Sequence, residues 1–227
     1  MKKIAFIGGY DKTDLIIYIA RILTVLGNSV LVIDTTLNKK TKYILPKMGK
    51  SVNYITTFER IDVAIGFENI EAIEKKLETK LEYDYVLIDI DSPINYRNFK
   101  ITSEDENLFV TGFDLYSLRR GVNIFKALTT KTNIRKVYFS QNMTEQENQY
   151  LEFLVKNPFV EWDKEIIYFP IDLQDMEIQN QNERMAKIKF RGFSNTYLDS
   201  LQYIVELISG IDKVKVKKAM KDVDENR

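Results

Sequence analysis

The segment at positions 8–13 carries residue types that bind phosphate. It follows an apolar run at 4–7 and precedes a helical pattern at 14–26. Glycines let the backbone turn tightly and approach an anion, a following lysine reaches the outer phosphates, and a threonine hydroxyl can hold magnesium. Because a helix N-terminus also presents unpaired N–H groups, the segment predicts a nucleotide-binding site. The candidate residues are Gly8, Gly9, Tyr10, Asp11, Lys12 and Thr13.

The same segment departs from the full phosphate-loop pattern G-x-x-x-x-G-K-[ST]. That pattern would place glycines at positions 6 and 11, where the chain has Phe6 and Asp11. A carboxylate about 4 Å from a phosphate costs roughly 1 kcal/mol in bulk water and roughly 4 kcal/mol at the effective dielectric of a protein surface. Asp11 therefore opposes phosphate binding unless magnesium or Lys12 offsets its charge.

Composition excludes several kinds of chemistry. The 227 residues include no His and no Cys, which removes imidazole bases, cysteine nucleophiles and the usual zinc ligands. The 33 Lys and Arg balance 33 Asp and Glu, so bulk electrostatic attraction to nucleic acid or anionic lipid is not expected. No apolar run reaches the roughly 18 residues that span a bilayer, and the run at 4–9 is too short for a signal-peptide core. We therefore expect a cytoplasmic protein.

The pattern along the chain predicts the elements that position these residues. Short apolar runs alternate with segments of helical spacing, which is typical of βαβ units and predicts a single-domain α/β fold with a mostly parallel sheet flanked by helices. The expected strands are 4–7, 30–33, 63–65, 86–88, 108–110, 137–139 and 166–169, and the expected helices are 14–26, 68–79, 114–129, 144–156 and 195–209. Asp34 and Asp89 each follow such a strand. They are therefore expected at the sheet edge where ligands bind.

Two segments are expected to differ from the rest of the α/β domain. The polar run at 174–184, within 172–193, predicts a solvated and mobile segment. We expect the α/β domain to cover 1–210 and to be followed by a charged C-terminal tail at 211–227. That tail is basic and then acidic, and it lacks the Trp, Phe or Leu anchors of a membrane-bound helix. A solvated tail is favoured over membrane contact.

In order, spacing and character, most of the chain resembles the ParA/MinD family of deviant P-loop ATPases. The family's K-G-G-x-G-K-[ST] has its counterpart at 7–13, and its strand ending in L-L-I-D has a counterpart at 30–34. The third signature, Y-D-Y-[VI]-[IL]-I-D, is nearly intact at 83–89 and is the strongest match. Residues 169–172 are similar to the late I-P-x-D turn. The resemblance implies a P-loop NTPase-like fold of the ParA/MinD type.

The resemblance also implies roles for individual residues. Lys12 would contact the β and γ phosphates of ATP, and Thr13 would ligate Mg²⁺, with Asp89 behind it at the metal site. Asp34 would be the catalytic residue that helps to position the attacking water. The implied cofactors are ATP and Mg²⁺, which we expect to bind weakly or not at all because of the departures from the family pattern.

These departures concern the most demanding parts of the chemistry. The family's signature lysine, which reaches across a dimer interface to the partner's nucleotide, is replaced by Ile7. Asp11 replaces the family's loop glycine, and Thr36 stands at the family's second acidic position after Asp34. Ile90 and Asp91 replace the T-P that usually follows the third signature. The changes remove both the anion cradle and the cross-subunit charge.

Each candidate also has a purely structural interpretation. Gly8 and Gly9 can form a tight strand-to-helix turn without any ligand. Asp11, Thr13 or Asp14 can cap the following helix, which stabilises it by roughly 0.5–2 kcal/mol. Lys12 can be a solvated charge, Asp34 and Asp89 can cap the next loops, and Tyr10 can pack against the core rather than stack on a base.

Two functional hypotheses remain open, and the first is favoured. It is a non-hydrolysing scaffold or regulator that binds a protein partner in a bacterial positioning, division, secretion or pilus-type assembly. The alternative is an active ATPase that positions cargo through ATP-dependent dimerisation, with another cation replacing the lost lysine. Candidate cations are Lys2, Lys3, Lys39, Arg119 and Arg120. Whether the chain forms a homodimer stays open, and neither nucleic acid nor membrane is expected as a partner. A kinase or synthetase on the same type of fold is a weaker alternative, because nothing identifies an acceptor substrate.

Overall fold

β-branched and aromatic residues form an eight-stranded sheet in the computed structural model, which describes residues 1–45, 52–141 and 144–225. The strands are β1 (Lys2–Ile7), β2 (Val30–Asp34), β3 (Tyr54–Phe58), β4 (Ile61–Ile65), β5 (Tyr85–Ile90), β6 (Glu106–Thr111), β7 (Thr132–Ser140) and β8 (Val160–Pro170). Their order is β3-β4-β2-β5-β1-β6-β7-β8. The β3–β4 pair is antiparallel and the other pairs are parallel. The predicted single-domain α/β fold is confirmed.

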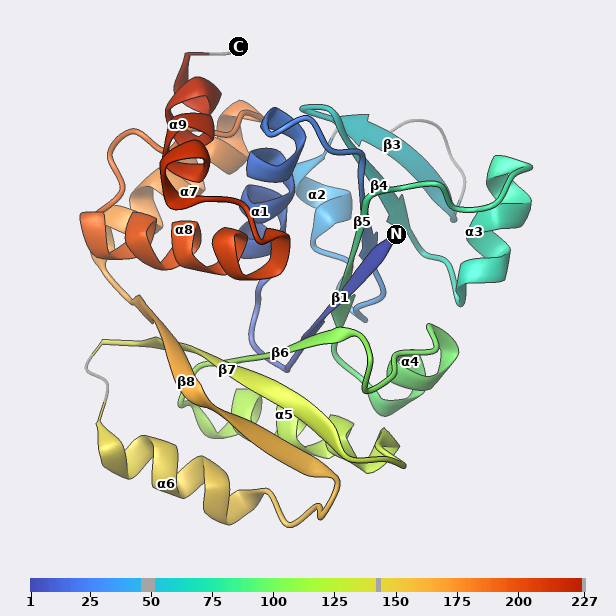
Figure 1. Ribbon diagram of the computed structural model, residues 1–227, viewed down its shortest axis with the longest axis vertical. Helices are drawn as coiled ribbons and strands as arrows, with labels where there is room; N and C mark the ends of the chain where they lie inside the picture. The colour runs from blue at the N-terminus through green and yellow to red at the C-terminus, as the bar shows by residue number, and fades with distance from the viewer. Residues whose placement is uncertain (46–51, 142–143, 226–227) are drawn as a thin grey trace.

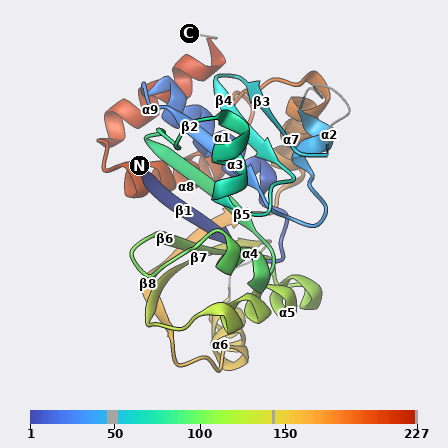
Figure 2. The ribbon, with the colours of Figure 1, turned by 90° about the vertical axis from the view of Figure 1, so that its right-hand side faces the viewer.

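Helices cover both faces of the sheet (Figures 1 and 2). They are α1 (Thr13–Val25), α2 (Thr41–Ile44), α3 (Ile70–Leu77), α4 (Pro93–Asn98), α5 (Leu115–Ile124), α6 (Glu145–Leu154), α7 (Leu173–Met185), α8 (Asn195–Ser209) and α9 (Lys213–Asp224), with a 3-10 turn η1 (Phe125–Ala127). One apolar cluster joins α1, α8 and α9 to the sheet, and a second joins α3, α4, α5 and α6 to the opposite face.

Alternation along β1 explains why both faces are covered. Ile4 and Phe6 belong to the cluster under α1, whereas Ala5 and Ile7 belong to the cluster on the other side. All four side chains are fully buried. A central parallel strand must be apolar on both faces, which is why it reads as a continuous apolar run. The end of β1 is therefore held rigidly where the chain enters the segment 8–13.

All five predicted helices are present, with small differences at their ends. The largest difference concerns the helix expected at 114–129, where α5 ends at Ile124 and continues as η1. The short helices α2 and α4 and the strand β3 were not predicted. Each is only four to six residues long, so it spans too few turns or alternations to show a period.

The polar run at 174–184, predicted as a solvated and mobile segment, lies within the helix α7. Asp172 caps α7 by accepting hydrogen bonds from the backbone N–H groups of Gln174 and Asp175. The inward-facing side chains include polar ones: Asp175 and Asn182 are buried and hydrogen-bonded. A helix that packs through polar groups leaves no apolar periodicity in its sequence.

The segment 211–227, expected as a charged tail, contains α9. Val216, Ala219, Met220 and Val223 recur at helical spacing and are buried against the cluster under α1. The lysines between them lie on the outer side of the helix, which explains why the sequence reads as charged. Among the residues that the structure describes, no helix is long and apolar enough to cross a membrane.

Candidate functional site

The segment 8–12 joins β1 to α1 and packs closely against its neighbours. The backbone N–H of Gly8 donates to the carbonyl oxygen of Ile90 at 2.9 Å. A Cβ atom on Gly8 would lie 2.0 Å from the carbonyl oxygen of Val110, and one on Gly9 would lie 2.6 Å from the Cβ of Arg120. Contacts with β6 and α5 are therefore enough to require both glycines, whether or not an anion binds.

The N-terminus of α1 is occupied by a carboxylate from the same loop. Lys12 is the N-cap residue, but its side chain makes no capping hydrogen bond. Asp11 Oδ1 instead accepts from the backbone N–H of Thr13 at 3.1 Å. Burial raises the pKa of the Asp11 carboxyl, but Lys40 and the Thr13 N–H outweigh this effect, so its pKa is lowered. An ionised Asp11 thus satisfies an N–H group that an external anion would need.

The Lys12 ammonium points inward rather than toward solvent. Its Nζ atom donates to the Gly8 carbonyl oxygen at 3.0 Å and lies 2.5 Å from Asp89 Oδ1. Both side chains of the ion pair are almost fully buried. Burial raises the pKa of the Asp89 carboxyl to about 7, with Lys12 acting in the opposite direction. The ammonium and the carboxylate therefore neutralise each other inside the protein.

Asp34 is held by the loop that follows β2. Strand pairing places it beside Asp89 in the neighbouring strand β5. Its Oδ1 accepts from the N–H of Thr36 at 3.0 Å and from the Thr36 hydroxyl at 2.6 Å, and its Oδ2 accepts from the Thr41 hydroxyl. In this arrangement both carboxylate oxygens are used to fix the loop 35–41.

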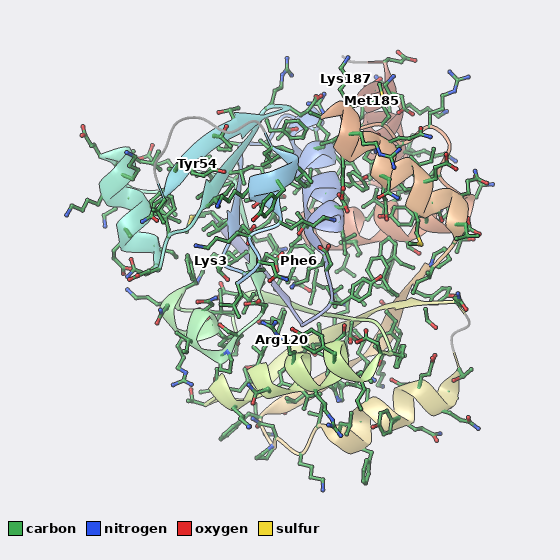
Figure 3. All side chains as sticks on the ribbon, turned by 180° about the vertical axis from the view of Figure 1, so that it is seen from behind. Lys3, Phe6, Tyr54, Arg120, Met185 and Lys187 are labelled. Atoms are coloured by element: carbon green, nitrogen blue, oxygen red, sulfur yellow. The ribbon has the colours of Figure 1, made fainter. Side chains whose placement is uncertain are left out.

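A second ion pair joins α5 to Asp91, the residue that follows β5. Arg120 on α5 lies below the end of β1 (Figure 3), and its Nη2 is 2.8 Å from Asp91 Oδ2. The backbone N–H of Leu37 donates to the same oxygen at 3.1 Å. Of the other cations considered as replacements for the family's lysine, Lys2 and Lys3 lie at the amino end of β1, the wrong end for this role.

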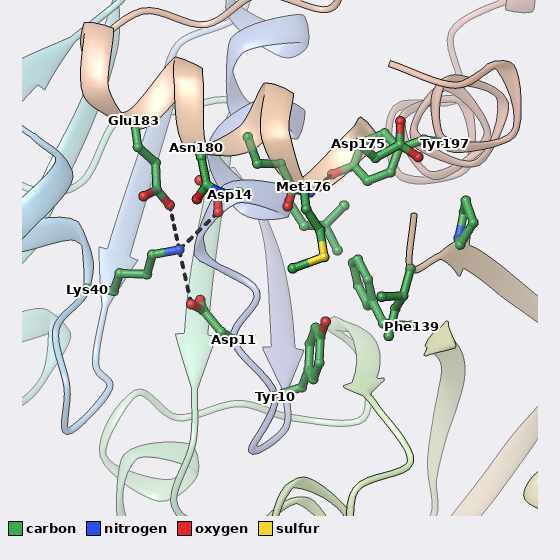
Figure 4. A pocket seen from close by; sticks show the side chains of 14 residues that line it. Tyr10, Asp11, Asp14, Lys40, Phe139, Asp175, Met176, Asn180, Glu183 and Tyr197 are labelled. Atoms are coloured by element: carbon green, nitrogen blue, oxygen red, sulfur yellow. Dashed lines mark hydrogen bonds and ion pairs between the residues drawn. The ribbon is translucent and has the colours of Figure 1, made fainter. Parts of the chain in front are cut away.

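Lys40 is a functional candidate that sequence reasoning missed. Its Nζ lies 3.1 Å from Asp11, 3.0 Å from Asp14 and 2.7 Å from Glu183, as Figure 4 shows. Burial raises the pKa of the Asp14 carboxyl to about 7, with Lys40 opposing and Glu183 adding to the rise. The cluster ties the loop 8–12, the β2–α2 loop and α7 together. The position of Lys40 after β2 was the signal in the sequence that could have pointed to this residue.

Two cavities adjoin the loop. One of about 280 Å³ is lined by Lys12, Thr13, Asp89, Asp91 and Arg120, among others. Asp34 is not among its lining residues.

The second cavity, of about 240 Å³, lies between the loop and α7 (Figure 4). Tyr10 lines it and stacks on Phe139 with ring centroids 4.9 Å apart. This packing corresponds to the structural interpretation of Tyr10.

The predicted site residues thus meet at one edge of the sheet, but their polar groups bind one another. Asp11 holds Thr13, Lys12 holds Asp89, and Asp34 holds its own loop. Within the described ranges, no group of three or more acidic side chains is arranged to hold a metal ion. Binding of ATP at this site would therefore require Asp11 and Lys12 to leave these internal partners.

The fold is that of MinD and McdA. A chain of the MinC:MinD cell division protein complex of Aquifex aeolicus superposes with a TM-score of 0.58 and 17% identity, over 93% of this chain and 97% of that one. A single-residue variant of McdA from Cyanothece, in complex with ATP, gives 0.58 and 10%, over 93% and 97%. A putative plasmid partition protein of Borrelia burgdorferi B31 bound to AMPPNP gives 0.55 and 13%, over 97% and 98%. No family model and no curated protein matches the sequence.

Proposed function

We propose that this chain is a ParA/MinD-like protein with a degenerate P-loop, which acts as a non-hydrolysing scaffold or regulator. In this proposal it binds a protein partner in a bacterial positioning, division, secretion or pilus-type assembly. The similarity to MinD and McdA supports the fold on which the proposal depends. The observation that carries the proposal is the hydrogen bond from the Thr13 N–H to the Asp11 carboxylate.

Binding of a triphosphate would have to overcome this internal contact. The phosphate would compete with Asp11 for the N–H of Thr13, and the two anions would repel each other by roughly 1–4 kcal/mol at about 4 Å. Lys12 would also have to leave Asp89, which would then be a buried carboxylate without its ion-pair partner. Removing one partner of a buried pair costs about 3–5 kcal/mol, so Mg²⁺ would have to replace the charge of Lys12 beside Asp89.

The proposed absence of hydrolysis follows from the apolar residue at position 7, Ile7. In the ParA/MinD pattern this position holds the lysine that reaches the partner's nucleotide. Here Ile7 is fully buried among the apolar side chains on the α5 side of the sheet. An apolar side chain in the core cannot stabilise the charge that develops on a transferred phosphoryl group.

One observation favours the alternative, an active ATPase. The cavity of about 280 Å³ brings Lys12, Thr13 and Asp89 together with Arg120, a cation from the same chain. Two proteins of this fold were solved with ATP or AMPPNP. If Lys12 withdrew from Asp89 on binding, Arg120 could supply part of the charge that Ile7 does not. The two hypotheses thus differ in whether nucleotide displaces the internal contacts.

The test is calorimetric titration of the protein with Mg·ATP, together with an assay of phosphate release. We expect no saturable heat at millimolar nucleotide, no phosphate release above that of Lys12→Ala, and the same mass by light scattering with and without nucleotide. Saturable binding with turnover that Lys12→Ala abolishes would overturn the proposal in favour of the ATPase.

A further inference from the structure

Large apolar side chains are exposed at the sheet edge that carries the candidate site. Four of them are more than 60% exposed and the fifth is almost half exposed, although most side chains of this size are buried elsewhere in the described chain. We call this set the edge surface. Its apolar members are Leu37, Tyr43, Ile94, Leu115 and Tyr116.

Hydrogen bonds and a shared cavity show that these residues form one surface. Leu37 donates its N–H to Asp91, and Arg120, one turn after Tyr116, forms an ion pair with the same carboxylate. Tyr43 and Tyr116 both line the cavity of about 280 Å³. Asn95 Nδ2, next to Ile94, donates to the carbonyl oxygen of Thr35, in the loop that carries Leu37. The loops after β2, β5 and β6 are thereby joined.

The edge surface also carries exposed positive charge. Lys42 on α2, Arg97 on α4 and Arg119 on α5 are exposed, and none forms an ion pair within residues 1–45, 52–141 and 144–225. Arg97 lies one turn after Ile94, and Arg119 one turn after Leu115, so each shares a helix face with an apolar member. Asp114 and Asp11 are exposed acids beside them: Asp114 accepts from the Ser117 N–H as the N-cap of α5, and Asp11, which lines the same cavity as Tyr43 and Tyr116, accepts from the Thr13 N–H.

We propose that the edge surface docks an acidic segment of a partner protein that also carries apolar or aromatic side chains. Tyrosine and arginine are among the residues that contribute most to protein interfaces, where they lie near the centre and are shielded from water, and charge of the opposite sign sets the choice of partner. This inference rests on the proposed function, because it gives a chemical class to the protein partner of that same site.

Charge argues against a second copy of this chain as the occupant. A two-fold dimer through the edge surface would place the same patch on both sides. The interface would then hold two copies each of Lys42, Arg97 and Arg119, against two copies each of the exposed acids Asp11 and Asp114. Like charges brought together in an interface disfavour the pairing, whereas an acidic segment would neutralise them.

The test is binding of a random copolymer of glutamate and tyrosine, measured by fluorescence anisotropy. We expect the copolymer to bind saturably, and Arg119→Glu and Tyr116→Ala should each weaken this binding by about tenfold or more. Polyglutamate, which lacks the aromatic side chains, should bind only weakly. The matched control is Lys215→Glu with Lys218→Glu, which reverses exposed lysines on α9 and should leave binding within about twofold. Thermal unfolding of each variant should match that of the wild type, since all these side chains are exposed.

Several results would overturn the inference. Equal weakening by the α9 control would show non-specific polyanion binding, and equal binding of polyglutamate would show that the apolar side chains do not contribute. Tighter binding of a single-stranded oligonucleotide would assign the surface to nucleic acid. A dimer in light scattering that Arg119→Glu or Tyr116→Ala dissociates would assign it to a second copy.

Mg·ATP titration of the same preparation separates this inference from the proposed function. Copolymer binding together with ATP turnover would support the docking surface and reject the scaffold proposal. Absence of both would reject the docking surface and leave the scaffold proposal standing.

Discussion

Asp11 and Thr13 determine whether the start of α1 can accept an anion. The Asp11 carboxylate is on the same loop as the N–H group that it binds, so an external phosphate must displace a neighbour that is always present. The sequence left two interpretations of Asp11 open, a spoiled phosphate loop and a helix cap. The structure shows that its carboxylate accepts from the Thr13 N–H in the first turn of α1, as the second interpretation expects.

The first prediction concerns substitutions of Asp11. Asp11→Gly removes the charge and frees the Thr13 N–H, so Mg·ATP affinity should rise by tenfold or more, which corresponds to about 1.4 kcal/mol. Asp11→Asn removes the charge but keeps an acceptor oxygen, so it should give a smaller gain. Titration calorimetry measures both. Asp212→Asn, at the N-cap of α9, is the control for a general change of charge and should have no effect.

An Asp11→Gly variant that binds Mg·ATP no better than the wild type would show that Asp11 is not the obstacle.

Restoring the family's lysine at position 7 would be a poor test of whether phosphate binding can be regained. Ile7→Lys would place an ammonium in the core around the fully buried Ile7 and would destabilise the protein before it could help a nucleotide.

The second prediction concerns pH and Asp14. The pKa of Asp14 rises from 3.8 to about 7 on folding, mainly because the group is buried. Between these values the folded state holds a proton that the unfolded state releases, so stability falls as pH rises from about 4 to 7. For one group the slope is at most about 1.4 kcal/mol per pH unit.

Urea unfolding at several pH values between about 4.5 and 7 measures this effect. Asp14→Asn should make the dependence shallower, while Asp89, whose pKa also rises to about 7, continues to contribute. An equal slope for Asp14→Asn and the wild type would contradict the assignment.

At the scale of elements, α7 shows why part of the fold could not be predicted from the sequence. Its sequence is polar, and its inner side is anchored by a carboxylate rather than by a row of apolar residues. Asp175 accepts from the Ser194 N–H at 2.6 Å and from the Ser194 hydroxyl at 2.7 Å. Such an anchor depends on a residue far along the chain, so no local period can reveal it.

The third prediction tests this anchor. Asp175→Ala should lower the free energy of unfolding by about 1–3 kcal/mol, because the Ser194 N–H and hydroxyl lose their acceptor. Glu177→Ala, at an exposed position of the same helix, should change it by less than about 0.5 kcal/mol. Urea unfolding measures both. Equal effects would mean that α7 does not depend on the buried carboxylate.

The fourth prediction tests the packing of α9. Val216 is fully buried, so Val216→Ala should cost about 1–3 kcal/mol through lost apolar burial and the cavity left behind. Lys218→Ala, on the exposed side, should cost less than about 0.5 kcal/mol. Thermal or urea unfolding gives both values. If residues 211–227 were a solvated tail, neither substitution would change stability.

At the scale of the whole molecule, the sequence predicted the sheet and the meeting of the candidate residues for the same reason. Buried parallel strands require apolar runs, and their carboxyl ends share one edge, so the segment 8–13, Asp34 and Asp89 had to converge there. The pairing of their charges could not be predicted. It depends on Lys40 and on the loop 35–41, whose conformation is set by contacts with Asp34.

The proposed function requires that the start of α1 be closed by the protein's own carboxylate. The most direct measurement is a crystal structure grown with Mg²⁺ and a non-hydrolysable ATP analogue at millimolar concentration. In that crystal, we expect Asp11 Oδ1 to accept from the Thr13 N–H near 3.1 Å as before, with Lys12 still paired with Asp89 and no phosphate beside them. Ordered phosphates bound to the Thr13 N–H, with Lys12 withdrawn from Asp89, would contradict it.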